Sequence, residues 1–444
     1  MEERKRKFKK INKFKSHKKT NIKCESKILR KIIFIFFLIS NYIIIIKNND
    51  FFNLEKNISP KFTIEEIREF EERVTSNLSM NTYEEFYSIN SQDKLIEENV
   101  KFEKSKNPEV SIVIAAYNFD KCIHRVLRSI QNQSLKNLEI IIIDDCSTDN
   151  TVEVIKKYQK EDPRIILIEH DSNDSPMKSR SDGIRKASGK YITIMDGDDA
   201  FLHKDILKNS LYIAKKGNID IVEFNHAMYN DGHFEQVAQF FYKLNLTNII
   251  YQPELRNIFI DINNNFPDDF KNRAIWSKLV RKEVFLKMLE YIGTEFSDDY
   301  IIWGEDTLMV VALVRTANSY YFIKEYGYYR NVGPNRRISS KIKNKVCKSN
   351  GKIRDFSFFK FLKFLVAKAG KNEKYQIMAY KEVTTGVNYN NYLNDFKMSK
   401  KHFEILFYIF DNALEFNFLN EQQKDYLRRL RNRAIEKRNR EKIE

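Results

Sequence analysis

Three carboxylates follow one another closely after a run of apolar, β-favouring residues. The run covers residues 191–195, and the acids are Asp196, Asp198 and Asp199. Carboxylates crowded at one strand end repel each other and favour a shared cation, and a hard divalent ion is held by one or two carboxylates together with substrate phosphates. The alternative is that these acids solvate a turn or cap the next helix. The spacing predicts a site for Mn²⁺ or Mg²⁺.

A second pair of acids, Glu305 and Asp306, opens an apolar segment that runs to residue 314 with helical periodicity. Two acids in the first turn of a helix could simply complement its dipole, which is worth about 0.3–1 kcal/mol. What chemistry this pair can do depends on the elements around it.

The elements that must position these acids alternate between strand and helix patterns. Nearly continuous apolar runs at residues 110–116, 138–143 and 165–168 predict buried strands, and helical periodicity at 120–133 and 151–159 predicts the helices between them. This rhythm indicates βαβ units with a parallel sheet and right-handed crossovers. Acids at the carboxyl ends of such strands lie where open α/β folds bind their ligands. Neither a GxGxxG motif nor a P-loop motif follows a strand, which disfavours those two binding modes.

Three motifs carry a resemblance to a known family. They read SIVIAAYN at residues 111–118, IIIIDDCSTDNT at 140–151 and SPMKSRSDGIRKASGKYITIMDGDD at 175–199. In order and spacing they resemble the family 2 glycosyltransferases, which are inverting enzymes with the GT-A fold. The resemblance covers about residues 110–200 and implies an α/β, Rossmann-like domain with a mostly parallel central sheet flanked by helices.

The resemblance implies roles for the residues at the strand ends. Ala116 and Tyr117 would line the nucleotide pocket, Asp145 would hydrogen-bond the base, Asp196 would lie near the ribose, and Asp198 would bind the metal. A divalent cation neutralises the charge that develops on a leaving diphosphate. For Asp145 a turn or capping role is the alternative. The donor is expected to be a nucleotide-diphospho-sugar, with a UDP-sugar as the leading candidate.

Arginines supply candidate contacts to the diphosphate. Arg180 and Asp182 stand where the family usually has an Arg-Asn pair, so Arg180 is expected to bind the donor, whereas Asp182 departs from the pattern. The family often has a segment corresponding to residues 326–340 that closes over the diphosphate. Arg330 and Arg336 are candidates for that clamp, because planar guanidinium groups suit phosphate oxygens. A solvated loop is the alternative.

The resemblance also gives the second acid pair a catalytic meaning. Asp306 is predicted to be the general base, with Glu305 orienting it or the acceptor, and the reverse assignment stays open. Inverting transfer needs one carboxylate within about 3 Å of the acceptor hydroxyl as its oxygen attacks the anomeric carbon. Trp276, in a segment similar to the WNKL stretch of some family members, and Trp303 are predicted to face the acceptor sugar. Trp276 could equally be a core residue.

The amino terminus combines a basic tail with an apolar run. Residues 1–31 hold 14 Lys and Arg against three Glu, which leaves only +5 of the net +16 on the other 413 residues and argues against a nucleic-acid partner. Residues 32–46 carry no charge, and with snorkelling flanks they predict a single-pass signal anchor. The positive-inside rule then gives a type II membrane protein with a lumenal catalytic domain, in the Golgi or ER of a eukaryote. A cleaved signal peptide and a buried core segment are the alternatives.

The remaining boundaries follow from composition. Residues 47–107 predict a charged stem that is helical or partly disordered. Residues 108–340 predict the GT-A domain, with a donor half at 108–200 and an acceptor half at 201–340, and residues 341–444 predict a helical carboxyl-terminal region. Four cysteines without CxxC spacing predict no disulfide framework.

The leading hypothesis is a metal-dependent inverting glycosyltransferase that acts on a hydroxyl of a glycan, glycoprotein or glycolipid. A nucleotidyltransferase also uses strand-end acids and a divalent cation, but the turn AAYNFDK after the first strand lacks the glycine-rich loop expected there. A catalytically inactive GT-A scaffold protein is a third hypothesis, and the presence of both acid groups argues against it.

Overall fold

A mixed ten-stranded sheet runs through the part of the chain that the computed structural model describes. The strand order is β3-β2-β1-β4-β9-β6-β10-β5, with β7 paired to β6 and β8 paired to β10. The predicted α/β class is confirmed.

Structure is described for residues 64–75, 101–230, 233–237, 248–256, 274–301, 304–331, 356–371, 376–377, 379–381, 383, 398 and 400–440. The strands are β1 (Val110–Ala116), β2 (Leu138–Asp144), β3 (Ile165–Glu169), β4 (Tyr191–Asp196), β5 (Ala200–Phe201), β6 (Ile221–Asn230), β7 (His233–Val237), β8 (Ile250–Tyr251), β9 (Lys278–Arg281) and β10 (Ser319–Asn331).

The first four strands form the parallel part of the sheet and bring acids to one edge. β1 pairs in parallel with β2 and with β4, and β2 pairs in parallel with β3. In this register Ala116 lies opposite Asp144 on β2, and Ala115 lies opposite Asp196 on β4. The chain leaves β1 toward β2 and β3 on one side and returns to β4 on the other, so the strand order reverses at β1. Open α/β sheets bind ligands at the carboxyl ends of the strands beside such a reversal.

The second half of the sheet is mixed, and the prediction of a mostly parallel sheet is wrong there. β9 runs antiparallel to β4 and β6, and β10 pairs in parallel with β6 but antiparallel with β5 and β8. β9 has only 4 residues and leads directly into a helix, so its sequence is too short to reveal its direction. β10 runs for 13 residues to Asn331 and so includes the first part of the segment at residues 326–340 that was expected to close over the diphosphate.

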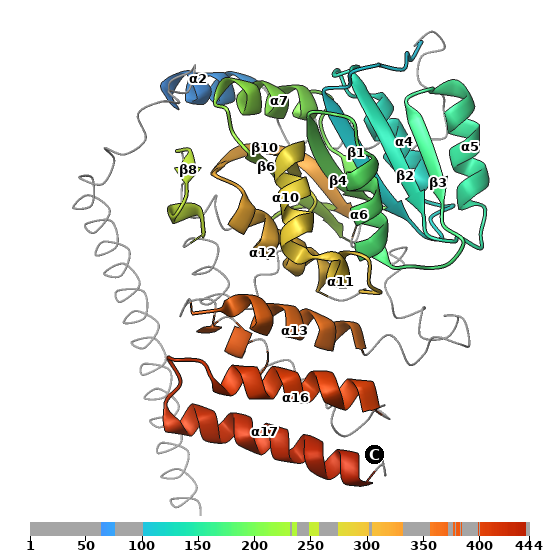
Figure 1. The fold of residues 1–444 in the computed structure, drawn as a ribbon. Helices are drawn as coiled ribbons and strands as arrows, with labels where there is room; N and C mark the ends of the chain where they lie inside the picture. The colour runs from blue at the N-terminus through green and yellow to red at the C-terminus, as the bar shows by residue number, and fades with distance from the viewer. Residues whose placement is uncertain are drawn as a thin grey trace, which may run out of the picture. The chain divides into compact units, whose positions relative to one another are not determined.

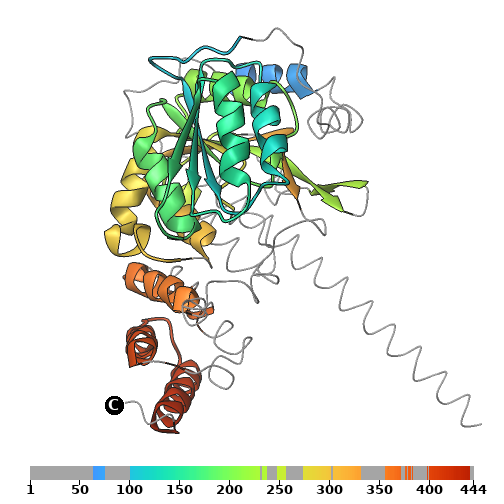
Figure 2. The ribbon, with the colours of Figure 1, turned by 90° about the vertical axis from the view of Figure 1, so that its right-hand side faces the viewer.

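Helices cover both faces of the sheet and bury an apolar cluster on each (Figures 1 and 2). One cluster joins Ile112 and Ile114 of β1 to α4, α5 and α7, and the other joins Val113 to α6, α10 and α12. Alternate residues of β1 therefore face opposite layers, as a strand buried on both sides requires. The helices are α2 (Ile64–Thr75), α4 (Ile123–Gln131), α5 (Thr151–Glu161), α6 (Pro176–Lys186), α7 (Ile206–Lys216), α10 (Lys282–Ile292), α11 (Thr294–Ser297), α12 (Glu305–Thr316), α13 (Phe356–Ala369), α16 (Lys400–Leu414) and α17 (Glu421–Arg440).

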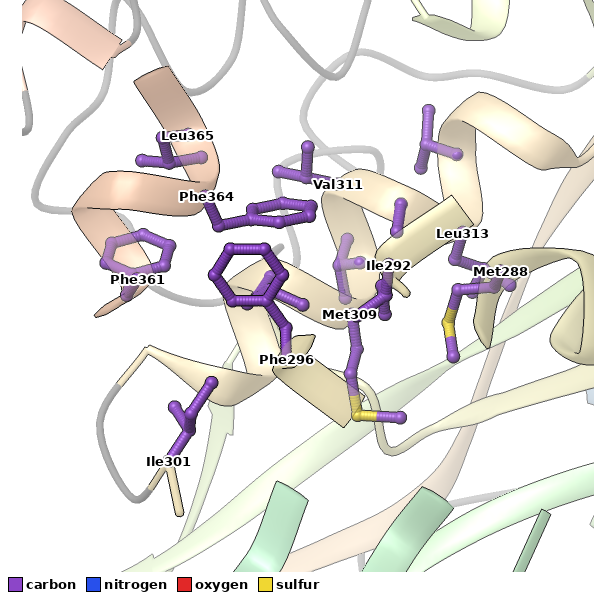
Figure 3. Close-up of a cluster of buried hydrophobic side chains, with 14 of the residues drawn as sticks. Met288, Ile292, Phe296, Ile301, Met309, Val311, Leu313, Phe361, Phe364 and Leu365 are labelled. Atoms are coloured by element: carbon purple, nitrogen blue, oxygen red, sulfur yellow. The ribbon is translucent and has the colours of Figure 1, made fainter. Parts of the chain in front are cut away.

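The carboxyl-terminal region contains helices, as predicted, and α13 packs against the helices of the sheet. The ring of Phe364 meets the ring of Phe296 of α11 edge to face at 5.3 Å between centroids. Figure 3 shows these two rings within one buried cluster, with Phe361 beside them. Arg315 of α12 donates a hydrogen bond of 2.8 Å to the carbonyl of Lys368. α13 therefore shares its core with α11 and with α12, the helix that carries the predicted catalytic acids.

The predicted stem contains a helix, α2, that packs on the core. The side chain of Ile67 is buried, and the ring of Phe70 stacks on Tyr212 of α7 at 4.4 Å between centroids. The predicted anchor at residues 32–46 lies outside the described residues. Within the described ranges, no helix combines the length and the apolar character needed to cross a bilayer.

Candidate active site

A cavity of about 180 Å³ opens at the carboxyl end of β4. Its walls come from the turn after β4, from α6 and α12, and from the end of β10. Both groups of acids singled out in the sequence line it, so residues far apart in the chain meet in one site. The lining residues are Arg180, Asp196, Asp198, Asp199, Trp276, Glu305, Asp306, Arg330 and Asn331.

Arg180 of α6 joins the two groups of acids. Its Nη1 lies 2.7 Å from Oδ1 of Asp306 and 3.4 Å from Oε1 of Glu305, and its Nη2 lies 2.7 Å from Oδ1 of Asp196. Burial opposes the guanidinium charge, but the carboxylates of Asp306, Asp196 and Glu305 outweigh burial and raise the pKa of Arg180. Sequence analysis assigned Arg180 to the donor, and the structure places it between three acids.

The acid pair occupies the first turn of α12, as predicted. Gly304, with φ of 76° and ψ of 4°, turns the chain into the helix in a left-handed conformation that favours glycine. The side chain of Asp306 is 31% exposed and that of Glu305 14%. Burial, followed by the charge of Asp306, raises the pKa of Glu305 to about 7. Burial also raises the pKa of Asp306, although Arg180 opposes this. Asp306 is therefore the acid that a substrate hydroxyl reaches more easily.

Asp199 is buried and serves the structure of the turn. Its Oδ2 accepts a hydrogen bond of 2.7 Å from the hydroxyl of Tyr328, and its Oδ1 accepts one of 2.8 Å from the backbone N–H of Asn331. Burial, together with the charges of Asp198 and Asp196, raises the pKa of Asp199 well above its usual range. The carboxyl of Asp199 thus ties the turn after β4 to the end of β10.

Asp196 and Asp198 are the acids of this turn that are partly exposed in the cavity. Both are half-buried and line the cavity, and Arg125 of α4 fixes the backbone by donating a 2.6 Å hydrogen bond to the carbonyl of Asp198. Across the described ranges, no group of three or more His, Cys, Asp or Glu is arranged to hold a metal ion. The turn after β4 thus presents two partly exposed carboxylates to the cavity, and a divalent ion is commonly held by one or two carboxylates together with substrate phosphates.

Asp145, predicted to read the base, is bonded to the loop before α6. Its two carboxylate oxygens accept backbone N–H groups from Asp174 at 2.8 Å and from Ser175 at 2.9 Å. Nδ1 of His170 lies 3.1 Å from Oδ1 of the same carboxylate. The side chain of Asp145 is 5% exposed. Its carboxylate therefore holds a loop, which is the turn role that the sequence left open.

The other predicted donor residues lie beside the cavity. Ala116 is buried at the end of β1 and accepts a 2.8 Å hydrogen bond from the N–H of Asp145, and Tyr117 after it is half-buried. Neither residue lines the cavity. The region predicted for the nucleotide therefore lies along the ends of β1 and β2, next to the acid cluster. Trp303 and Arg336 lie outside the described residues.

Trp276 lines the cavity but is 4% exposed. Its ring stacks on Tyr328 at 4.9 Å between centroids, meets the ring of His226 edge to face at 4.8 Å, and lies 5.6 Å from the guanidinium of Arg330. Trp276 therefore serves mainly as a buried support for the end of β10. Arg330, also on the cavity wall, is placed by this stacking.

Tyr328 and Asn331, which fix the turn of the acid cluster, were not predicted from the sequence. Both lie in the segment that was expected to close over the diphosphate. The aromatic residues of YGYYRN at positions 326–331 are typical of strands and could have indicated that β10 continues to Asn331.

Comparison with known proteins gives matches over the same part of the chain. Residues 111–288 match the model of Glycosyl transferase family 2. An uncharacterized glycosyltransferase of Haemophilus influenzae is 35% identical over 120 residues, which are 27% of this chain and 48% of the relative. Glycosyltransferase GlyA of Streptococcus pneumoniae is 27% identical over 196 residues, 44% of this chain and 27% of the relative. The chain thus spans about half or less of the length of these curated relatives.

A solved structure shares the fold. The crystal structure of S. aureus TarS residues 1–349, in complex with UDP-GlcNAc, has a TM-score of 0.50 and 17% sequence identity, covering 76% of this chain and 92% of that one. The expected placement in the Golgi or ER as a type II membrane protein is wrong, because these relatives are bacterial and bacteria have neither organelle. The motifs and the family match identify residues 111–288 as a glycosyltransferase family 2 domain, and the solved structure shares its GT-A-like fold.

Proposed function

We propose that the protein is an inverting glycosyltransferase that moves a sugar from a nucleotide-diphospho-sugar to an acceptor hydroxyl. The observation that carries the proposal is the meeting of the acids after β4 and the acid pair of α12 in one cavity, with Arg180 bonded to both groups. A donor diphosphate beside Asp198 and an acceptor hydroxyl beside Asp306 would hold both reactants in one small site, which removes most of the entropic cost of their encounter.

Asp306 acts as the general base in this proposal. The acceptor oxygen attacks the anomeric carbon and its proton passes to Asp306. The bond between the anomeric carbon and the diphosphate oxygen breaks, and its electron pair leaves with the nucleoside diphosphate. Attack from the side opposite the leaving group inverts the configuration. Because Arg180 bonds Oδ1 of Asp306, the second carboxylate oxygen is the one offered to the acceptor.

A divalent cation fits the carboxylates of this site. Asp196 and Asp198 line the cavity, Asp199 is bonded elsewhere, and the incoming diphosphate adds further negative charge beside them. Asp198 is the proposed ligand, because it lies on the turn after β4, lines the cavity and is partly exposed there. When bound, Mn²⁺ or Mg²⁺ would neutralise the charge that develops on the leaving diphosphate. Arg330 also lines the cavity and is proposed to contact the same phosphates.

The donor is proposed to be a UDP-sugar. TarS shares the fold and was crystallised with UDP-GlcNAc, and the ends of β1 and β2 provide the surface for the nucleotide beside the acid cluster. The acceptor is proposed to be a hydroxyl on a glycan or glycoconjugate.

The test uses the full chain, because α2 packs on the core and a fragment that begins at residue 107 would lack it. The purified protein is incubated with a panel of sugar nucleotides and Mn²⁺ or Mg²⁺, and released nucleoside diphosphate and bound donor are measured. We expect release with at least one donor. No release and no binding with any donor would contradict the proposal.

Two variants then separate the roles of the two acids. Asp306→Asn should retain donor binding and lose transfer by about 10²- to 10⁴-fold, the usual contribution of a general base. Asp198→Asn should lose metal-dependent donor binding. Asp411→Asn is the control, because Asp411 is an exposed acid on α16 that pairs with Arg431. Full activity of Asp306→Asn would show that the base is another residue.

A further inference from the structure

The residues that lead into α12 rest on the loop that precedes α6. The backbone N–H of Ile301 donates a 3.1 Å hydrogen bond to Oγ of Ser175, and the Ser175 hydroxyl donates to the carbonyl of Asp299 at 3.4 Å. The hydroxyl of Tyr300 donates to Oδ1 of Asn173 at 3.3 Å. We call residues 299–301 the strap. The strap is thus bonded to residues 173–175 by three hydrogen bonds, two of them through one serine side chain.

The same loop is bonded on its other side to the end of β2. The carboxylate of Asp145 accepts the N–H groups of Asp174 and Ser175 at 2.8 and 2.9 Å, and Nδ2 of Asn173 donates to the carbonyl of Asp145 at 3.1 Å. Ser175 therefore has its backbone N–H on Asp145 and its side chain on the strap. It is the residue that connects the two.

The conformation of Ser175 indicates that its hydroxyl has a specific use. The residue is completely buried, with φ of 95° and ψ of 156°, a region that residues with a side chain rarely adopt. Glycine would fit this backbone with less strain. A serine directly before a proline at a helix start would ordinarily cap its own helix, but Ser175 makes no side-chain cap bond to α6. Its hydroxyl is used by the strap instead.

The far side of the strap is held by α13. Lys360 forms an ion pair with the carboxylate of Asp299, and its Nζ donates to the carbonyl of Tyr300 at 3.4 Å. Figure 3 shows Ile301 and Phe361 in the same buried cluster. The ring of Phe361 lies so close to Gly304 that a Cβ there would meet it at 2.7 Å. Because contacts on both sides hold the strap, the strap fixes the position at which α12 begins. Asp306 is the second residue of that helix.

We propose that Ser175 is a positioning residue that couples nucleotide binding at the end of β2 to the placement of Asp306. The inference rests on the proposed function. A nucleotide that contacts the end of β2 restricts the motion of the loop held by Asp145. Because Ser175 bonds this loop to the strap, the strap and the first turn of α12 are then restricted as well. A displacement of the general base, Asp306, by about 1 Å is enough to lower the rate of transfer about 10²-fold without changing the affinity for the donor.

The kinetic test compares two substitutions of Ser175 with a matched control. Ser175→Ala and Ser175→Gly both remove the hydroxyl, and the glycine variant also relieves the backbone strain. We expect kcat to fall at least tenfold in both, with the donor dissociation constant changed less than threefold. The control is Ser319→Ala, which removes the hydroxyl of another buried serine, at the start of β10, that accepts the N–H of Asp220 at 3.0 Å. It should leave kcat unchanged.

Hydrogen exchange then separates this inference from the proposed function. In the wild type, UDP with Mn²⁺ should slow exchange at residues 144–147, at 173–175, and also at 299–301 and 305–308. In Ser175→Gly the protection should stop at residue 175. If UDP protects no segment, the proposed UDP-sugar donor is wrong. If it protects the first two segments but not the last two, or if Ser175→Gly keeps wild-type kcat, the coupling through Ser175 is wrong and the proposed function stands.

Discussion

Replacing Arg180 with lysine separates two roles for this residue, donor binding and placement of the base. Arg180 bonds Asp306 and Asp196 through two different nitrogens at 2.7 Å each, and its side chain is only 5% exposed. Lysine keeps the positive charge but has a single nitrogen, so it loses the fork that spans both acids. Arg180→Lys should therefore fold and should release one of the two acids.

The size of the effect follows from the bond that is lost. A hydrogen bond to a charged group contributes about 1.5–3 kcal/mol. Because about 1.4 kcal/mol corresponds to a tenfold change in rate, loss of the Asp306 bond should lower kcat about 10- to 150-fold. Removing the charge altogether, as in Arg180→Met, leaves buried acids without their partner and should destabilise the fold by about 3–5 kcal/mol.

The assay measures kcat with saturating donor and, separately, the donor dissociation constant and the midpoint of thermal unfolding. Arg185→Lys on the same helix is the matched control, because Arg185 is 37% exposed and pairs with Asp298 at 2.6 Å away from the cavity. A wild-type kcat in Arg180→Lys with a weakened donor constant would refute the reasoning and return Arg180 to the donor-binding role expected from the sequence.

Three further predictions concern the same site. Chelation with EDTA should remove transfer, and added Mn²⁺ should restore it. Asp198→Asn should need more Mn²⁺ for half-maximal activity. Undiminished transfer in EDTA would show that the reaction does not depend on the cation. Since folding raises the pKa of Glu305 from 4.5 to about 7, folding favours its protonated form, and the wild type should lose stability relative to Glu305→Gln as the pH rises through this range. Thermal unfolding of both proteins across that range measures this, and parallel curves would contradict it. Gly304→Ala should lower the unfolding temperature, because alanine at φ of 76° costs about 1–2 kcal/mol and its Cβ meets Phe361 at 2.7 Å; an unchanged midpoint would mean that α13 gives way.

The position of the first acid cluster could be predicted because it depends on local pattern and strand register. Apolar runs of the β1 and β4 type are recognisable as buried strands, and parallel pairing then brings Ala115 opposite Asp196 without further information. The acid pair of α12 was predictable in the same way, from helical periodicity that starts at Glu305. The second half of the sheet was not, because the 4 residues of β9 carry no pattern that gives their direction.

The partners of the site residues could not be predicted, because they depend on distant contacts. Arg180 lies in the same helix as Asp182 and close to the donor motifs, but its bonds reach Asp196 and Asp306. Asp199 belongs to the acid cluster by sequence, yet its carboxylate accepts a hydrogen bond from the hydroxyl of Tyr328, near the end of β10. Spacing gives the residue types at a site, and only the fold decides which acid is left for the substrate.

Ser175 is the clearest case of this limit. In the sequence it precedes Pro176 at a helix start, where a serine is expected to cap the helix it precedes. The structure directs its hydroxyl to residues more than a hundred positions later, and its N–H to the acid at the end of β2. A local rule therefore fails where a side chain has a better partner elsewhere, and such failures mark residues with a function beyond local stability. Here the failure falls between the end of β2, where the nucleotide is proposed to bind, and the helix that carries the proposed base, so the local rule fails at the residue proposed to connect them.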